Sequence, residues 1–132
     1  MRLFDRLISS FLAIAILFGV AQAAPRSDPV KRFDTDNDGT LDHIEVRKAA
    51  TAFFARIDPD HDGTLDMREL RSRLTAEEVM AADPDHDGTL SVNEYLAVVA
   101  QRFKAADRDG DGTLDGHELR SPAGRALLRL LQ

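Results

Sequence analysis

An acidic segment of twelve residues occurs four times in this chain, at residues 34–45, 58–69, 83–94 and 107–118. Every copy has Asp at its first, third and fifth positions, Gly at the sixth, Leu at the eighth and Glu at the twelfth. The acidic residues outside these segments are Asp5, Asp28, Glu77 and Glu78. Four such matches in one short chain are not a chance event, so the fold must place four groups of like-charged side chains in turns.

The repeated segment matches the pattern D-x-[DN]-x-[DN]-G-x5-E and therefore resembles the calcium loop of the EF-hand family. This resemblance covers most of the chain after its N-terminal segment. Calcium takes about six to eight oxygen ligands at about 2.3–2.6 Å, and a short loop supplies them when carboxylates alternate along it. Glycine at position six permits a sharp turn that a Cβ atom opposes. A bidentate Glu at position twelve raises the coordination number above the octahedral geometry that magnesium demands.

The resemblance implies ligands at positions one, three, five, seven, nine and twelve of each loop. Position seven offers the backbone carbonyl of a Thr, and position nine often acts through water. The third loop has Ser at position nine and is one carboxylate short. We expect up to four calcium ions, bound by Asp34, Asp36, Asp38, Thr40, Asp42, Glu45, Asp58, Asp60, Asp62, Thr64, Asp66, Glu69, Asp83, Asp85, Asp87, Thr89, Ser91, Glu94, Asp107, Asp109, Asp111, Thr113, Asp115 and Glu118.

The stretches between the loops predict helices. Residues 46–57 and 95–106 carry apolar side chains at helical spacing, and each stretch is short enough for one helix to leave one loop and enter the next. Asp28 before Pro29 predicts an earlier helix start, and Thr75 with Glu78 predicts another after a break near Leu74. The fold class we predict for residues 24–132 is all-α and EF-hand-like: four helix-loop-helix calcium loops, short loop-pairing strands, and shared or short connecting helices.

Loop pairing is the part of the fold that the residues leave open. In the EF-hand family, position eight lies on a short strand that pairs two loops antiparallel. The loops start 24, 25 and 24 residues apart, closer than in calmodulin-like proteins, so the two-lobed arrangement of those proteins does not follow. A straight shared helix predicts that loop one pairs with loop three and loop two with loop four. A kink within residues 46–57 predicts that neighbouring loops pair instead.

The first 23 residues have the organisation of a secretory signal peptide. Arg2 and Arg6 precede an apolar run over residues 7–20, and an A-x-A cleavage site ends at Ala23. The run is short for a membrane span. We therefore expect cleavage after Ala23, export to the periplasm or out of the cell, and no membrane span in the mature chain. An uncleaved membrane anchor is the alternative.

Charge and cysteine content bear on stability and on partners. The formal net charge is −6 and the chain has no cysteine, so disulfides cannot stabilise this small domain. Clustered carboxylates destabilise a compact state through self-repulsion, whereas a metal bound only by the folded chain stabilises it.

Most basic residues fall between the loops on expected solvated helix faces. They predict no continuous basic face and therefore no nucleic-acid partner.

Catalytic signatures are absent from the sequence. It has no Cys nucleophile, no glycine-rich phosphate loop and no serine elbow, and its four histidines fall at loop positions that are not ligands. We therefore predict a non-enzymatic calcium-binding protein, either a buffer or a calcium-stabilised binding module. The alternative is a sensor that exposes a groove built from Phe53, Phe54, Tyr95 and Phe103 to a protein partner, although Met67 and Met80 are few for such a groove.

The C-terminal segment after loop four predicts one more helix. Ser121 and Pro122 read as its N-cap and first residue, and Gly124 is expected to weaken it. Its leucines either close the core or form a tail that contacts a partner or a membrane. Further side chains that we expect to pack in the interior are Phe33, Ile44, Phe53, Ile57, Leu70, Val79, Val92 and Phe103.

Overall fold

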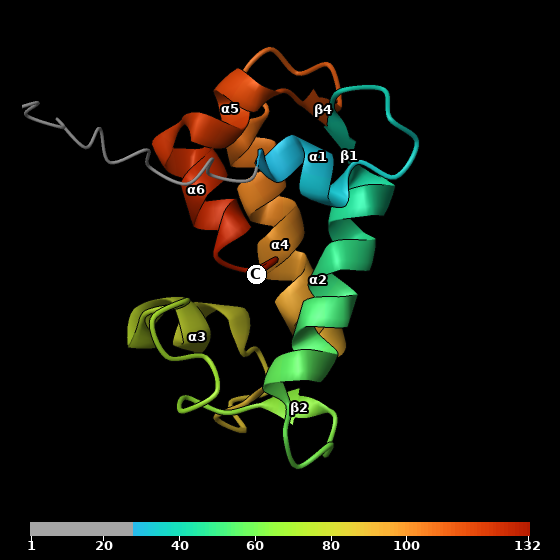
Figure 1. The fold of residues 1–132 in the computed structure, drawn as a ribbon. Helices are drawn as coiled ribbons and strands as arrows, with labels where there is room; N and C mark the ends of the chain where they lie inside the picture. Colours follow the sequence, from blue (N-terminus) through green and yellow to red (C-terminus); the bar gives the residue numbers. More distant parts are fainter. Residues whose placement is uncertain (1–27) are drawn as a thin grey trace, which may run out of the picture.

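The computed structural model describes residues 28–132, so the predicted signal peptide lies outside the described residues. Helices and two-residue strands alternate along the described chain (Figure 1). In chain order they are α1 (Pro29–Phe33), β1 (Leu41–Asp42), α2 (His43–Ile57), β2 (Thr64–Leu65), α3 (Ala76–Ala82), β3 (Leu90–Ser91), α4 (Val92–Ala106), β4 (Thr113–Leu114), α5 (Gly116–Arg120) and α6 (Pro122–Leu128). The prediction of an all-α, EF-hand-like fold with short loop-pairing strands is confirmed.

Helices α2 and α4 form the centre of the fold, and each connects two loops. Each is 15 residues long and continuous, and the two pack against each other. Both begin with a capping box, in which the N-cap side chain and the Glu three residues later satisfy each other's backbone N–H groups. Their apolar stripes face the interior, with Val46, Ala50 and Phe54 on α2 and Tyr95 and Phe103 on α4 all buried.

The loops pair in an arrangement that neither of our two alternatives predicted. Strand β1 pairs antiparallel with β4, and β2 pairs antiparallel with β3, so loop one pairs with loop four and loop two with loop three. The alternative in which loop one pairs with three and loop two with four is therefore wrong, although the shared helices on which it was based are present. Loops one and two do not pair either, because α2 is continuous and holds them at its opposite ends. Since α4 lies antiparallel beside α2, each end of this helix pair brings together the first and last loops or the two middle loops (Figure 1).

The chain leaving loop two differs from the helix-loop-helix pattern. Residues 67–73 form consecutive turns rather than an exit helix, and Ser72 adopts a left-handed backbone with φ of 67°. Helix α3 then begins after Thr75, whose side chain accepts a hydrogen bond from the Glu78 N–H in the predicted capping box. Helix α3 begins at Ala76, seven residues after Glu69, so the segment that leaves loop two is short. This turn lets loops two and three come together at one end of α2 and α4.

The position-eight leucines join the two loop pairs to the core. Leu41 lies opposite Leu114 and Leu65 opposite Leu90, and all four have no exposed surface. The predicted interior side chains are largely buried or half-buried, with one error. Ile44 is 76% exposed, because it follows the helix start on the face of α2 that points to solvent.

The C-terminal segment closes the core, as the first of its two interpretations predicted. Leu127, Leu128, Leu130 and Leu131 are all buried, and the Tyr95 hydroxyl donates a hydrogen bond of 2.8 Å to the Leu130 carbonyl. The alternative, a tail whose leucines contact a partner or a membrane, is wrong because these side chains already pack inside. Burial raises the pKa of the Tyr95 hydroxyl above its ordinary value, which keeps it a neutral donor.

Gly124 has a packing role in addition to the low helix propensity expected of it. A Cβ atom at this position would lie 2.2 Å from the Glu118 carbonyl oxygen and 2.5 Å from the Leu119 Cα atom. Both contacts are with backbone that a rotamer change cannot move. Glycine therefore permits α6 to cross α5 at close range, and this contact outweighs its low helix propensity.

Candidate metal sites

Three carboxylates converge in each of the four loops. They come from positions one, three and twelve, and in every loop one oxygen from each lies within 4.8 Å of the others. The four groups are Asp34, Asp36 and Glu45; Asp58, Asp60 and Glu69; Asp83, Asp85 and Glu94; and Asp107, Asp109 and Glu118. Residues separated by eleven positions in sequence thus meet at one point. The same arrangement recurs in loop three, which sequence alone made the weakest site.

The loop backbone is folded onto the Asp at position one. The N–H of the position-six glycine donates to this carboxylate in all four loops, at 3.0 Å from Gly39 to Asp34 and 2.9 Å from Gly88 to Asp83. The equivalent distances are 3.1 Å in loop two and 3.0 Å in loop four. The position-six glycines have φ between 84° and 89°. This left-handed conformation is costly for residues with a Cβ atom, which explains the glycine.

Position five is held by a contact that our sequence analysis missed. Thr40 donates both its N–H and its hydroxyl to Asp38, each at 2.8 Å. The same pair of hydrogen bonds joins Thr64 to Asp62, Thr89 to Asp87 and Thr113 to Asp111. We assigned position seven only a backbone carbonyl, but its hydroxyl also orients the carboxylate two residues earlier. The repeated Thr was the signal, since a carbonyl ligand requires no particular side chain.

Position nine begins the helix or turn that carries the position-twelve Glu. Asp42 accepts a 2.8 Å hydrogen bond from the Glu45 N–H, and the Glu45 carboxylate accepts from the Asp42 N–H at 3.2 Å. Equivalent reciprocal bonds hold Glu69, Glu94 and Glu118. Positions five and nine are not among the three converging carboxylates. Their assignment as ligands stays a prediction, while their hydrogen bonds position the groups that do converge.

Position four also has a backbone explanation. Asn37, His61 and His86 occupy it with φ of 62°, 57° and 57°, and Gly110 occupies it in loop four with φ of 74°. Asn, His and Gly tolerate this left-handed region better than most residues. The recurrence of His61 and His86 is therefore explained by loop geometry.

The pKa of the position-three Asp is raised in loops one, three and four. A hydrogen bond from the Asp38 N–H lowers the pKa of Asp36, yet desolvation and the charges of Asp38, Glu45 and Asp34 outweigh it, so the pKa is raised. Asp109 in loop four has a raised pKa for the corresponding reasons. In loop three, the hydrogen bond shared with Asp83 is the largest cause of a raised pKa at Asp85. Nearby negative charges disfavour ionisation, and a cation placed among them relieves this repulsion.

The donor set fits a hard divalent cation. Each loop contains one nearly buried acid, namely Glu45, Asp58, Asp83 or Glu118, with 4–7% exposure. In loop two the Asp58 Oδ1 atom is buried and has no hydrogen-bond partner within the described chain. A buried polar atom without a partner is costly. Oxygen ligands alone, without His or Cys, suit calcium or magnesium better than zinc.

A comparison with family models identifies the fold's relatives. The model described as EF hand matches residues 31–49, 51–75 and 98–121, which together make up just over half of the chain. The chain belongs to the EF-hand family. The described residues thus form an EF-hand calcium-binding domain, as the loop pattern predicted. The three matches include loops one, two and four, and loop three lies outside them.

Curated relatives and membrane-spanning helices are both absent from what was found for the described residues. A comparison with curated proteins found no match. Within residues 28–132, no EF-hand helix has the length and apolar character needed to cross a membrane. The longest helices of this part, α2 and α4, have 15 residues each and carry charged side chains.

Proposed function

We propose that this EF-hand protein is an exported, non-enzymatic calcium binder that holds up to four ions, one in each loop. The observation that carries the proposal is the set of four carboxylate groups, each converging within 4.8 Å. Repulsion in these groups, together with the unpartnered Asp58 Oδ1 atom, supports a cation at each centre. When bound, calcium supplies positive charge that neutralises each group and links the two sides of the loop.

A role without catalysis is supported by the positions of the histidines. His43 stacks on the Phe103 ring at 3.8 Å between centroids, and His61 and His86 occupy the left-handed position of their loops. The converging carboxylates are assigned to cations.

We favour a buffer or a calcium-stabilised binding module over a sensor because Met67 and Met80 are few for the Met-rich groove of a sensor. Phe53, Phe54, Tyr95 and Phe103 are each at most 3% exposed, so a groove built from them requires the core to open. Fluorescence of a dye that binds apolar surface distinguishes the two roles. An unchanged signal on adding calcium supports the buffer, and a rise supports a sensor that exposes a groove to a protein partner.

Export is proposed from the N-terminal sequence, which has a positive start, an apolar run and a cleavage site. We expect the full-length chain, expressed with its N-terminal segment, to be recovered outside the cytoplasm with Ala24 as its first residue. Mass spectrometry of that fraction measures this directly. A retained Met1 in the membrane fraction would support the uncleaved anchor.

Calorimetric titration of residues 24–132 with calcium in excess magnesium tests the binding proposal. We expect a stoichiometry of four, because each loop contains its own carboxylate group. The variant Glu45→Gln removes a charge from loop one and should reduce the stoichiometry by one. Glu77→Gln is the matched control, since Glu77 is an exposed acid outside the loops.

The loop pairing gives Glu45→Gln a second expected effect. Because β1 pairs with β4, loss of the ion from loop one should weaken calcium binding in loop four about fivefold or more, a normal coupling between sites. Loops two and three should change little. The amide signals of Gly39, Gly63, Gly88 and Gly112 report the loops separately in a nuclear magnetic resonance titration. An unchanged stoichiometry would contradict the ligand assignment, and weakening of loop two instead of loop four would contradict the coupling.

A further inference from the structure

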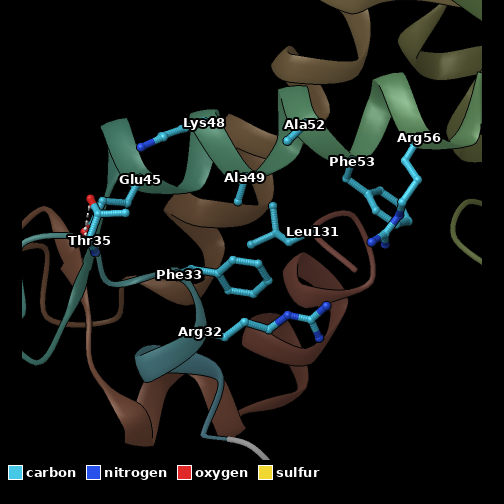
Figure 2. Close-up of a pocket in the computed structure, with 10 residues that line it drawn as sticks. All are labelled: Arg32, Phe33, Thr35, Glu45, Lys48, Ala49, Ala52, Phe53, Arg56 and Leu131. Carbon is cyan, nitrogen blue, oxygen red and sulfur yellow. Dashed lines mark hydrogen bonds between the residues drawn. The ribbon is translucent and has the colours of Figure 1, made fainter.

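A pocket outside the carboxylate centres lies between α1, α2 and the C-terminal residues. It has a volume of about 270 Å³, and its apolar walls include Phe33, Ala49, Phe53 and Leu131. Figure 2 shows the Phe33 ring and the Leu131 side chain pointing into it from opposite elements. Arg32 and Arg56 lie at one end of the pocket, whereas Glu45 lies beside Thr35 at the other, with Lys48 on the same side (Figure 2). The pocket therefore combines an apolar interior with a cationic end.

Phe53 lines the pocket, and its burial is not explained by packing in the hydrophobic core. Its side chain is 3% exposed, yet it does not belong to the cluster of buried residues that forms the core. The Arg56 guanidinium lies 4.6 Å from its ring centroid, and the Arg73 guanidinium lies 4.8 Å from it. The Arg73 Nε atom is buried and has no hydrogen-bond partner among residues 28–132. Two cations are thus held over an aromatic ring at the edge of the pocket.

The arginines at the cationic end are available to an anion. Within residues 28–132, the arginine that forms an ion pair is Arg102, which lies 2.8 Å from Glu78. Neither Arg32 nor Arg56 forms an ion pair with a carboxylate of these residues. Arg32 donates from Nη1 to the Gln132 Oε1 atom at 2.9 Å. A guanidinium carries about five N–H donors, so most of those on Arg32 and Arg56 remain for a ligand.

We propose that this pocket binds a monocarboxylate with a short, straight apolar chain. Guanidinium groups bind carboxylates through paired, charge-assisted hydrogen bonds, and the apolar walls take the chain. The volume is below the range of about 300–1,000 Å³ typical of ligand pockets, which favours a short chain. This proposal is independent of calcium stoichiometry, so either can fail alone.

Octanoate is the probe, added to calcium-loaded residues 24–132 while amide signals are followed by nuclear magnetic resonance. We expect shifts at Phe33, Ala49 and Leu131. Affinity should rise about fourfold for each methylene added between butyrate and octanoate, because each enters an apolar pocket. Octylammonium, with the same chain and the opposite charge, should not shift these signals at the same concentration.

Two variants test the cationic end. The double variant Arg32→Gln with Arg56→Gln should weaken octanoate binding about tenfold or more, the usual effect of losing charge-assisted hydrogen bonds. Lys104→Gln is the matched control and should bind like the parent, because Lys104 is exposed and does not line this pocket. Equal binding of octanoate and octylammonium, parent-like binding by the double variant, or shifts confined to other surfaces would each overturn the proposal.

Discussion

Removal of calcium from residues 24–132 is expected to lower the thermal unfolding midpoint by at least about 20 °C relative to millimolar calcium. An ion that binds only the folded state, at about 100 times its Kd, contributes about 2.7 kcal/mol. For domains of this size, each 1 kcal/mol shifts the midpoint by about 4–8 °C. In chelator all four carboxylate groups are left unneutralised, and in three of them the pKa is raised, at Asp36, Asp85 and Asp109, so the loss should be large. Circular dichroism during heating measures it.

Two controls separate calcium binding from general screening. Added potassium chloride should recover only part of the lost stability, because it screens the loop charges without coordinating them. Magnesium at the same concentration as calcium should also recover less, since it dehydrates reluctantly and demands octahedral geometry. An unfolding midpoint and helix signal that are equal in chelator and in calcium, with no heat of binding, would refute the proposed function.

The variant Gly124→Ala is expected to lower the free energy of unfolding by about 3 kcal/mol at constant calcium, the upper part of the range for overpacking. Its Cβ atom would lie 2.2 Å from the Glu118 carbonyl oxygen and 2.7 Å from the Leu119 carbonyl carbon. Helix α6 must therefore move away from α5, which disturbs the buried Leu127 and Leu128 side chains. Because Glu118 is the position-twelve acid of loop four, calcium affinity in that loop should fall as well. Denaturant unfolding and calorimetry measure the two effects.

Gly116→Ala is the matched control for this prediction. A Cβ atom at Gly116 would approach only the end of the flexible Arg120 side chain, at 3.2 Å from Nη1. Alanine is favoured over glycine in helices by about 1 kcal/mol, so this variant should be neutral or slightly stabilising. A Gly124→Ala variant as stable as Gly116→Ala would show that the α5–α6 contact relaxes at little cost.

Much of the fold and of the candidate site could be predicted because the deciding interactions are local. The spacing of Asp34, Asp36 and Glu45 within one loop was enough to predict that their carboxylates converge. The helix starts after Asp28, Thr75 and Ser121 were also correct, since an N-cap side chain bonds to N–H groups only two or three residues away. The hydroxyl of Thr40 was overlooked, although its recurrence at position seven of every loop marked it.

The sequence by itself determined four acidic loops, the helices between them and the calcium chemistry, because each depends on residues close together in the chain. Only the tertiary structure decided that loop one pairs with loop four and loop two with loop three, since this follows from α2 and α4 packing antiparallel. Two further features also depend on the tertiary structure: the close contact of Gly124 with α5, and the presence of Arg32 and Arg56 in one pocket. Each results from elements that meet only after the chain has folded, and no local pattern of residues encodes such a contact.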